Sequence, residues 1–173
     1  MNTEFQSRSY VVGENVKALD IMPTRFKSSE ALSNEALASA AFADMDPSFS
    51  KAAQAGEYGI VVAGPNFGGG GKTVEGPVFA LRGAGIKLVI ADSFARYFLR
   101  NSINNGFPIL VCPGISTNIC TGDEIAVSLD TGSIQNLSSG KEFTAQPLSQ
   151  IALDILKAGG LVNYARSKLT GGE

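Results

Sequence analysis

The chain of 173 residues carries 14 Lys and Arg against 16 Asp and Glu, with no His and two Cys. A chain of this length normally forms one domain with a core of its own, so we expect a single domain over residues 1–173. Without His, no imidazole can act as base, acid or metal ligand. Cys112 and Cys120 alone cannot supply the three or four protein ligands that an iron–sulfur or zinc site usually takes. We therefore expect no metal site on this chain.

The charge balance and the N-terminus exclude further classes of function. A net charge of −2 and a pI near 5.2 disfavour nucleic acid, which needs a basic surface. The opening sequence MNTEFQSRSY has no apolar targeting segment, and no apolar run approaches the roughly 20 residues of a membrane span. We expect a soluble, cytoplasmic protein with no membrane partner. Its two cysteines fit buried thiols in a reducing compartment, and a bridge between them stays open.

The first third of the chain predicts short elements. Tyr10–Val16 is typical of a short strand and turn, and a loop follows through Pro23, Arg25 and Phe26. The Ala- and Leu-rich segment Ser29–Ala43 has apolar residues at helical spacing and predicts a helix. Pro47–Ala55 predicts one more short helical turn.

The middle of the chain alternates apolar strands with helices, which favours a parallel sheet covered by helices. We expect Asp92 or Ser93 to cap the second helix, which runs through Asn104 and has Phe94, Tyr97 and Phe98 on its core face. The predicted strands are Gly59–Ala63, Lys87–Ala91 and Pro108–Cys112, and the first helix is Val78–Gly85.

The last third predicts antiparallel strands followed by one helix. Two strands, Glu124–Leu129 and Ser133–Asn136, are joined by a turn, and the chain turns again before Phe143. Pro147–Ala158 predicts a helix that ends at two glycines, and the tail from Ser167 is expected to fray.

The segment Gly64–Pro77 contains four consecutive glycines, Gly68–Gly71. Such a run predicts a loop in which the backbone turns sharply or approaches a ligand. Gly71-Lys72-Thr73 resembles the end of a nucleotide-binding P-loop, but Asn66 stands where that motif has its opening glycine and Gly76-Pro77 interrupts the helix that should follow. Nucleotide hydrolysis is therefore disfavoured, while an anion held by backbone N–H groups and Lys72 stays open.

Longer motifs identify a family. The sequences Gly64-Pro65-Asn66-Phe67-Gly68, Val89–Arg96 and Arg100–Pro108 resemble the small subunit of 3-isopropylmalate dehydratase, and more broadly the swivel domain of the aconitase superfamily. Looser matches, Gly13-Glu14-Asn15-Val16 near the start and Ala158-Gly159-Gly160-Leu161 near the end, extend the resemblance over almost the whole chain.

The resemblance implies an α/β fold of the aconitase swivel type, which is a barrel-like fold of three layers in the order β/β/α. Its core sheet is mostly parallel and its C-terminal part is antiparallel and rich in strands. It implies a hydro-lyase that removes and returns water on a substituted malate, a small dicarboxylate. It also implies a separate large subunit whose three cysteines hold a 4Fe–4S cluster, so that this chain binds no cofactor itself and works in a heterodimer or heterotetramer.

In the resembling family the loop carries Ser-Ser-Arg, and its first Ser is the catalytic base. Two alignments of the family loop with this chain are possible. Counted back from Ala80-Leu81, the positions of the two serines are occupied by Lys72 and Thr73. Counted forward from Asn66, they are occupied by Gly71 and Lys72. We prefer the first register, and in both the loop's Arg is lost. Lys72 is then the proton acceptor or the cation that binds a substrate carboxylate, and Thr73 completes the catalytic pair. The predicted substrate-binding residues are Arg25, Asn66, Gly70, Gly71, Lys72 and Thr73.

Other readings stay open. The altered loop fits a related dehydratase acting on a dimethylmalate, a homoaconitate or a specialised metabolite. A non-catalytic anion-binding or assembly subunit is the alternative of a different class. In the plainest reading, the glycines form a tight structural turn and Lys72 is a solvated surface lysine.

Overall fold

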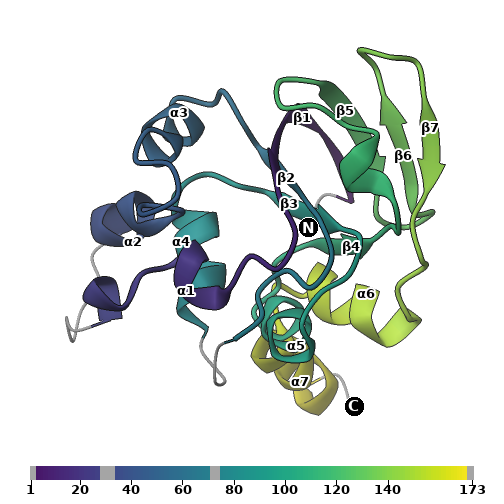
Figure 1. Ribbon diagram of the computed structural model, residues 1–173. Coiled ribbons are helices and arrows are strands. Elements are labelled where there is room, and N and C mark those ends of the chain that lie inside the picture. The colour runs from purple at the N-terminus through teal and green to yellow at the C-terminus, as the bar shows by residue number, and fades with distance from the viewer. Residues whose placement is uncertain (1–2, 28–33, 71–74, 171–173) are drawn as a thin grey trace.

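The computed structural model describes residues 3–27, 34–70 and 75–170 (Figure 1). In the described part of the chain, a seven-stranded sheet has the order β4-β3-β2-β1-β5-β6-β7. Strands β1 to β4 are parallel to one another, and β5 to β7 continue the sheet as antiparallel neighbours. The strands are β1 (Glu4–Val12), β2 (Ile60–Ala63), β3 (Leu88–Ala91), β4 (Ile109–Val111), β5 (Glu124–Ser128), β6 (Ser133–Asn136) and β7 (Glu142–Thr144).

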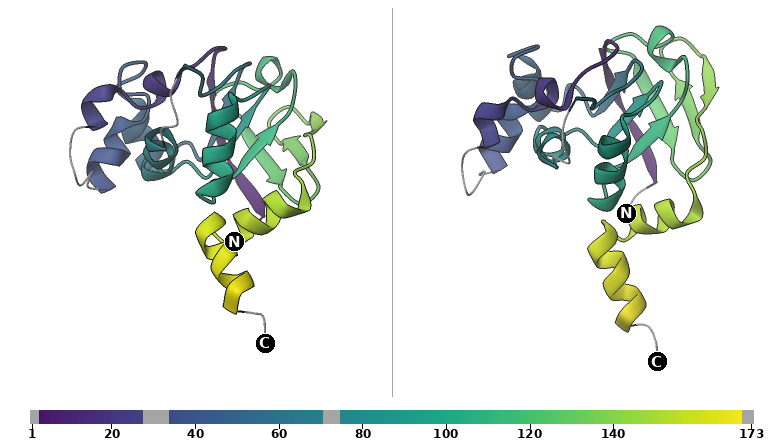
Figure 2. Two further views of the ribbon diagram at one scale, coloured as in Figure 1. Left: turned by 90° about the horizontal axis from the view of Figure 1, so that it is seen from below. Right: turned by 60° about the horizontal axis from the view of Figure 1, so that its bottom comes forward.

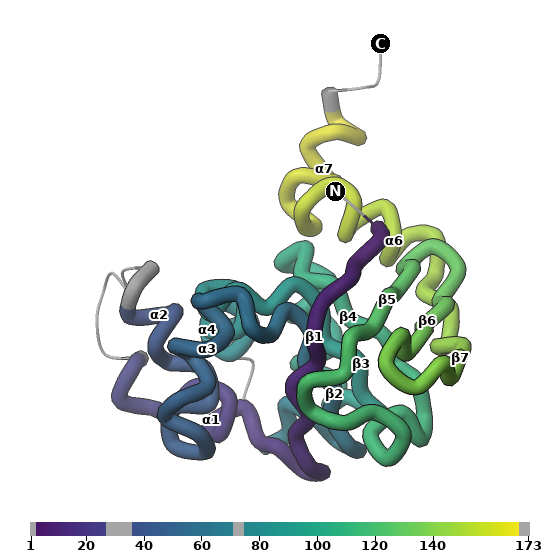
Figure 3. The backbone as a smooth tube through the Cα atoms, turned by 90° about the horizontal axis from the view of Figure 1, so that it is seen from above, coloured from purple at the N-terminus to yellow at the C-terminus, as the bar shows by residue number. Residues whose placement is uncertain are grey.

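Strand β1 joins the two halves of the sheet, as its central course in Figure 3 shows. Its first half pairs antiparallel with β5, from Glu4 opposite Ser128, and its second half pairs parallel with β2, from Ser9 opposite Ile60. At the change of partner Ser9 is fully buried, and its Oγ donates to the carbonyl of Cys120 at 2.8 Å. That bond satisfies the hydroxyl, which would otherwise make its burial costly.

The helices lie in two groups around the sheet (Figures 1 and 2). The first group is α1 (Ala18–Ile21), η1 (Thr24–Lys27), α2 (Asn34–Ala40), α3 (Phe49–Gln54) and α4 (Gly76–Gly83). The second is α5 (Arg96–Asn104), α6 (Gln150–Lys157) and α7 (Leu161–Thr170), and a short turn η2 (Ile115–Thr117) follows β4. Helix α7 projects away from the body of the molecule (Figure 2). Within the described ranges no helix has both the length and the apolar character to cross a membrane.

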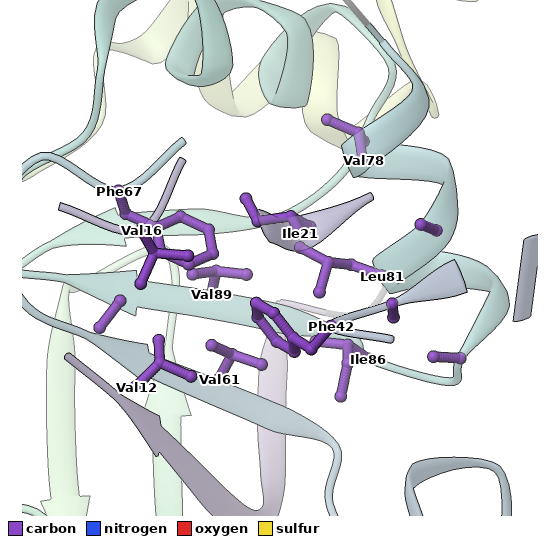
Figure 4. Packing of buried hydrophobic residues seen from close by; sticks show 14 of the residues in the cluster. Val12, Val16, Ile21, Phe42, Val61, Phe67, Val78, Leu81, Ile86 and Val89 are labelled. Atoms are coloured by element: carbon purple, nitrogen blue, oxygen red, sulfur yellow. The ribbon is translucent and has the colours of Figure 1, made fainter. Parts of the chain in front are cut away.

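Side chains that point alternately to the two faces of the buried parallel strands produce two hydrophobic cores. Val61 and Val89 point toward the helices and pack in one apolar cluster (Figure 4), whereas Ile60 and Leu88 belong to a second cluster. That second cluster also contains Ile125 and other residues of the antiparallel strands. Because successive side chains of a strand face opposite ways, one sheet of short apolar strands serves both cores. The helices, the parallel strands and the antiparallel strands form the three predicted layers, and the predicted α/β fold class is confirmed.

Several predicted boundaries are wrong. Strand β1 begins at Glu4 rather than Tyr10 and ends at Val12, because its alternating exposed and buried side chains already suit an antiparallel partner. Two short helices, α1 and η1, occupy the predicted loop. Helix α2 ends at Ala40 rather than Ala43, and its predicted start at Ser29 lies outside the described residues.

The predicted interruption at Gly76-Pro77 is also wrong, since both residues open α4. Proline is tolerated in the first helical turn, where its missing N–H would have had no partner. The predicted frayed tail is helical as far as Thr170, as part of α7. The strands and helices of the middle and last thirds are otherwise confirmed within a few residues.

Helix α5 begins later than predicted. Its N-cap is Ala95, so neither Asp92 nor Ser93 caps it. On its predicted core face Phe98 is buried and Phe94 packs against the core, but Tyr97 is 51% exposed. Because Phe94 lies before the helix, the helical spacing that put it on one face with Tyr97 and Phe98 does not apply, and Tyr97 faces solvent.

Candidate functional site

The candidate site lies at the carboxyl ends of the parallel strands, where ligands of open α/β sheets commonly bind. Four connections meet at this edge of the sheet, and the glycine-rich segment follows β2. Backbone hydrogen bonds hold these connections together across the edge, for example from Asp92 N–H to the carbonyl of Ala63 at 3.0 Å.

The described part of the glycine segment is pinned on both sides by backbone pairing. On one side Gly68 N–H donates to the carbonyl of Val16, and Ala18 N–H donates to that of Gly69, both at 2.8 Å. On the other side Phe67 N–H donates to the carbonyl of Ser93 at 3.0 Å. The segment therefore extends the sheet edge between the loops that follow β1 and β3.

Phe67 anchors this segment in the core. Its side chain is completely buried and meets Phe98 edge to face, with ring centroids 5.1 Å apart. Phe94 and Phe42 approach it in the same geometry. Burying such a side chain contributes about 1.5–3 kcal/mol, which offsets the cost of ordering the neighbouring glycines.

Gly68 follows directly and permits this packing. Its φ of +80° is a conformation that favours glycine, and a Cβ at this position would come within 2.4 Å of Phe98 Cβ. The residue is therefore required by the backbone and by the close approach of α5. This part of the glycine run has a structural cause, independent of any ligand.

Two asparagines stabilise the turn before Phe67. Asn15 and Asn66 both have positive φ, 55° and 60°, which asparagine tolerates better than most residues. The Asn66 amide donates to Asn15 Oδ1 at 3.1 Å, and the backbone N–H of Asn66 donates to Ser93 Oγ at 2.9 Å. Asn15 N–H in turn donates to the carbonyl of Pro65 at 2.8 Å. The loops after β1, β2 and β3 are thus tied together by side chains as well as backbone.

A groove of about 480 Å³ opens beside this loop. On its wall, Asp92 accepts hydrogen bonds from the backbone N–H of Ser116 at 3.1 Å and from Ser116 Oγ at 2.9 Å. The side chain predicted as a helix cap thus links β3 to η2. The groove is lined by Val11, Val12, Gly13, Glu14, Gly64, Pro65, Asp92, Ser116 and Thr117.

Part of the predicted site can be placed. Asn66 and Gly70 are exposed in the same loop. Arg25 lies in η1, where its Nη1 is 2.6 Å from Asp44 Oδ1 and its guanidinium lies over the Phe26 ring. Gly71, Lys72 and Thr73 lie outside the described residues. The assignments of Arg25, Asn66, Gly70, Gly71, Lys72 and Thr73 therefore stay predictions.

Sequence reasoning missed Asn15 and Ser93 as residues that hold the loop. Asn15 belongs to a Gly-Glu-Asn turn, a composition typical of a positive φ, and this signal could have indicated its role. Ser93 was predicted as a cap because it precedes a helix, and its hydrogen bond to a distant loop has no local signal.

The cysteines do not assemble a metal site. Cys112 is buried, and burial together with the nearby Asp92 carboxylate raises the pKa of its thiol. Cys120 is exposed, so the prediction of two buried thiols is wrong for this residue, and neither cysteine is in a disulfide. Across residues 3–27, 34–70 and 75–170, no group of three or more His, Cys, Asp or Glu side chains could hold a metal ion. The described donors therefore do not fit an iron–sulfur cluster.

Comparison with known proteins matches residues 12–112 to the aconitase C-terminal domain. The chain is 40% identical to the isopropylmalate/citramalate isomerase small subunit of Methanocaldococcus jannaschii and 41% identical to the 3-isopropylmalate dehydratase small subunit of Aquifex aeolicus, each over 98% of both chains. The chain belongs to the 3-isopropylmalate dehydratase small-subunit family. The family identified from the sequence motifs is thus confirmed.

The fold agrees with this family. A crystal structure of 3-isopropylmalate dehydratase from Methanocaldococcus jannaschii superimposes with a TM-score of 0.87, covers 96% of each chain and is 33% identical. The chain is therefore a hydro-lyase subunit of the aconitase superfamily with the swivel fold.

Proposed function

We propose that this chain is the small subunit of a dehydratase that removes water from, and returns it to, a substituted malate such as 3-isopropylmalate or citramalate. The observation that carries the proposal is identity of about 40%, over nearly the full chain, to relatives named for these substrates. A glycine loop pinned at the carboxyl edge of a parallel sheet supports it, because such an edge presents backbone donors to a small ligand.

The proposed chemistry centres on Lys72 and Thr73, which follow the pinned segment directly in sequence. Lys72 either takes the proton beside a substrate carboxylate or binds that carboxylate as a cation, and Thr73 supplies a hydroxyl. As a base, Lys72 needs a lowered pKa, which removal from water on closure would provide. Asn66, Gly70 and Gly71 contribute donors that position the substrate.

Arg25 has a less direct proposed role. Its planar guanidinium could bind a second carboxylate, but in the unliganded chain it pairs with Asp44. Substrate binding by Arg25 therefore requires this exposed ion pair to open. Exposed pairs contribute only about 0–1 kcal/mol, so a substrate carboxylate could displace Asp44 at small cost.

We further propose a separate large subunit that carries the 4Fe–4S cluster, in a cytoplasmic heterodimer or heterotetramer. The relatives are named as small subunits, which supports a larger partner. The described donors of this chain do not fit the cluster, so its ligands are assigned to that partner. This chain would act as one swivel domain that closes over the partner's site.

The test is anaerobic reconstitution of this chain with a cluster-bearing large subunit of the same family, followed by assay of 3-isopropylmalate, citramalate, dimethylmalate and homoaconitate. We expect turnover of at least one of these substrates and a loss of roughly a hundredfold or more in kcat/KM for Lys72→Ala. Lys87→Ala, an exposed lysine before β3 at the other end of the sheet, is the matched control.

The outcomes separate the alternatives. Full activity of both Lys72→Ala and Thr73→Ala would refute the assignment of these two residues, but the proposed dehydratase activity would stand. Turnover of homoaconitate or dimethylmalate alone would favour the related dehydratase, which the altered loop supports. A well-formed complex that converts none of the panel would favour the non-catalytic subunit.

A further inference from the structure

Lys17 lies against the glycine loop, although no sequence motif singles it out. Its backbone forms a parallel bridge with Gly69. Its side chain then runs beside Gly70: a Cβ at Gly70 would lie 3.4 Å from Lys17 Cγ and 3.5 Å from Lys17 Cδ. The lysine stem therefore crosses the loop at the last described residue before Gly71, where glycine leaves room for it.

No described residue pairs with the ammonium group of Lys17. Lys17 is exposed, and the nearby Asp20 carboxylate accepts a hydrogen bond from the backbone N–H of Lys17 at 2.8 Å. Ion pairs between described residues join Arg25 to Asp44 and Lys157 to Asp130, and neither they nor any hydrogen bond among these residues involves Lys17 Nζ. Lysine stems commonly lie along a protein surface while the ammonium group stays in water, so what Lys17 can bind depends on where its ammonium group can reach.

A second donor lies beside the Lys17 stem. Gly70 is exposed, and within the described part of the chain its N–H donates to no acceptor. An ammonium group and a backbone N–H presented together are the pair of donors that a carboxylate accepts. The acidic group beside Lys17 is Asp20, whose carboxylate accepts the hydrogen bond from the backbone N–H of Lys17 at 2.8 Å.

We propose that Lys17 is a substrate-binding residue that holds one carboxylate of the dicarboxylate substrate, together with Gly70 N–H. This inference rests on the proposed function and adds a cation from the loop after β1 to the site. It assigns Lys17 to binding rather than to proton transfer. A lysine ammonium group supplies a carboxylate with a hydrogen-bonded counter-ion.

The experiment uses the reconstituted two-subunit enzyme with 3-isopropylmalate, or with citramalate if that is the better substrate. For Lys17→Met we expect KM to rise about tenfold to a hundredfold, the usual cost of losing a charged hydrogen bond, with kcat changed less than about threefold. Lys17→Arg should keep KM within about fivefold of the native value. Lys87→Met is the control and should match the native enzyme.

Two mono-amides of the substrate, each lacking one of its two carboxylate charges, test the contact between Lys17 and a single carboxylate. They are assayed as substrates or as competitive inhibitors. The penalty of Lys17→Met should vanish for one mono-amide and persist for the other. An equal penalty for both mono-amides would overturn the proposal and indicate a structural effect on the loop. Thermal unfolding of each variant subunit checks that the fold is intact.

Failure of the inference differs from failure of the proposed function. An active native enzyme whose KM is unchanged by Lys17→Met overturns only the role of Lys17. A correctly assembled native enzyme that converts no substrate overturns the proposed function, and the assignment of Lys17 falls with it.

Discussion

The side-chain amide of Asn66 donates to Asn15 Oδ1 at 3.1 Å, and both residues hold the backbone at positive φ. This pair links the loop after β1 to the loop after β2 at the point where the glycine segment begins. Both residues are exposed, so the pair is accessible to substitution without disturbing the core.

We expect Asn15→Gly and Asn66→Gly each to lower the free energy of unfolding by about 0.5–1.5 kcal/mol, because each removes the same hydrogen bond while glycine keeps the positive φ. The double variant should cost less than the sum of the two single changes. Urea denaturation of the four proteins measures this coupling. Strictly additive changes would mean that the hydrogen bond contributes nothing to stability.

Gly68 gives a sharper prediction because the chain contains a matched control. Gly68 and Gly114 have nearly the same φ, +80° and +81°, but a Cβ at Gly68 would overlap Phe98 whereas one at Gly114 would meet nothing within 4 Å. Gly114→Ala should cost about 1–2 kcal/mol from backbone strain alone. Gly68→Ala should cost at least about 2 kcal/mol more, because α5 must move. Equal losses in denaturant unfolding would refute the packing argument.

Asp46 should make the protein sensitive to acid. Its carboxylate accepts hydrogen bonds from Ser48 Oγ at 2.6 Å and from the Tyr10 hydroxyl at 2.8 Å, and these bonds hold the pKa of Asp46 below its ordinary value. A carboxyl whose pKa is lowered by folding stabilises the protein above the unfolded pKa, about 3.9, and loses that contribution as the pH falls through the folded pKa. Stability should therefore decline below about pH 4.

The variants Asp46→Asn and Ser48→Ala isolate this contribution. Their stability deficit relative to the native chain should be constant between about pH 5 and 7 and should shrink toward about pH 2, where the native carboxyl is protonated. Chemical denaturation across this range measures the deficit. A deficit that stays the same in acid would show that Asp46 does not titrate with folding.

The two thiols should differ in reactivity. Cys120 is exposed, whereas Cys112 is buried and the pKa of its thiol is raised, chiefly by burial. Because the thiolate is the reactive form, an aromatic disulfide reagent should modify one thiol rapidly in the folded chain and both after denaturation. Cys120→Ser should abolish the rapid phase and Cys112→Ser should keep it. Rapid reaction of both thiols in the native chain would contradict the burial of Cys112.

Much of the fold follows from local patterns. The apolar runs that became β2, β3 and β4 are too short for buried helices, and their alternation with helical segments indicates a parallel sheet. The four glycines predict a loop, and the described part of that loop follows β2 at the carboxyl edge of the sheet. These features depend on residues close in sequence, which is why a single sequence reveals them.

Features that depend on distant partners could not be predicted in this way. Asp92 precedes a helix and has the composition of a cap, but its hydrogen bonds go to Ser116. Residues 4–9 alternate exposed and buried side chains only because β5 pairs with them from more than a hundred residues away. Lys17 carries no motif, and only the bridge between its loop and the glycine segment gives it a place near the site.

The pairing of β1 with β5 along its first half and with β2 along its second half also affects when the sheet can form during synthesis. Among the described strands β1 is synthesised before the others, although it is the middle strand of the sheet, and its partners follow much later, β2 at Ile60 and β5 at Glu124. Pairing of such distant segments is slow, and an unpaired strand edge is prone to aggregate. Polar side chains at a strand edge disfavour such aggregation, and Glu4, Gln6 and Arg8 of β1 are exposed.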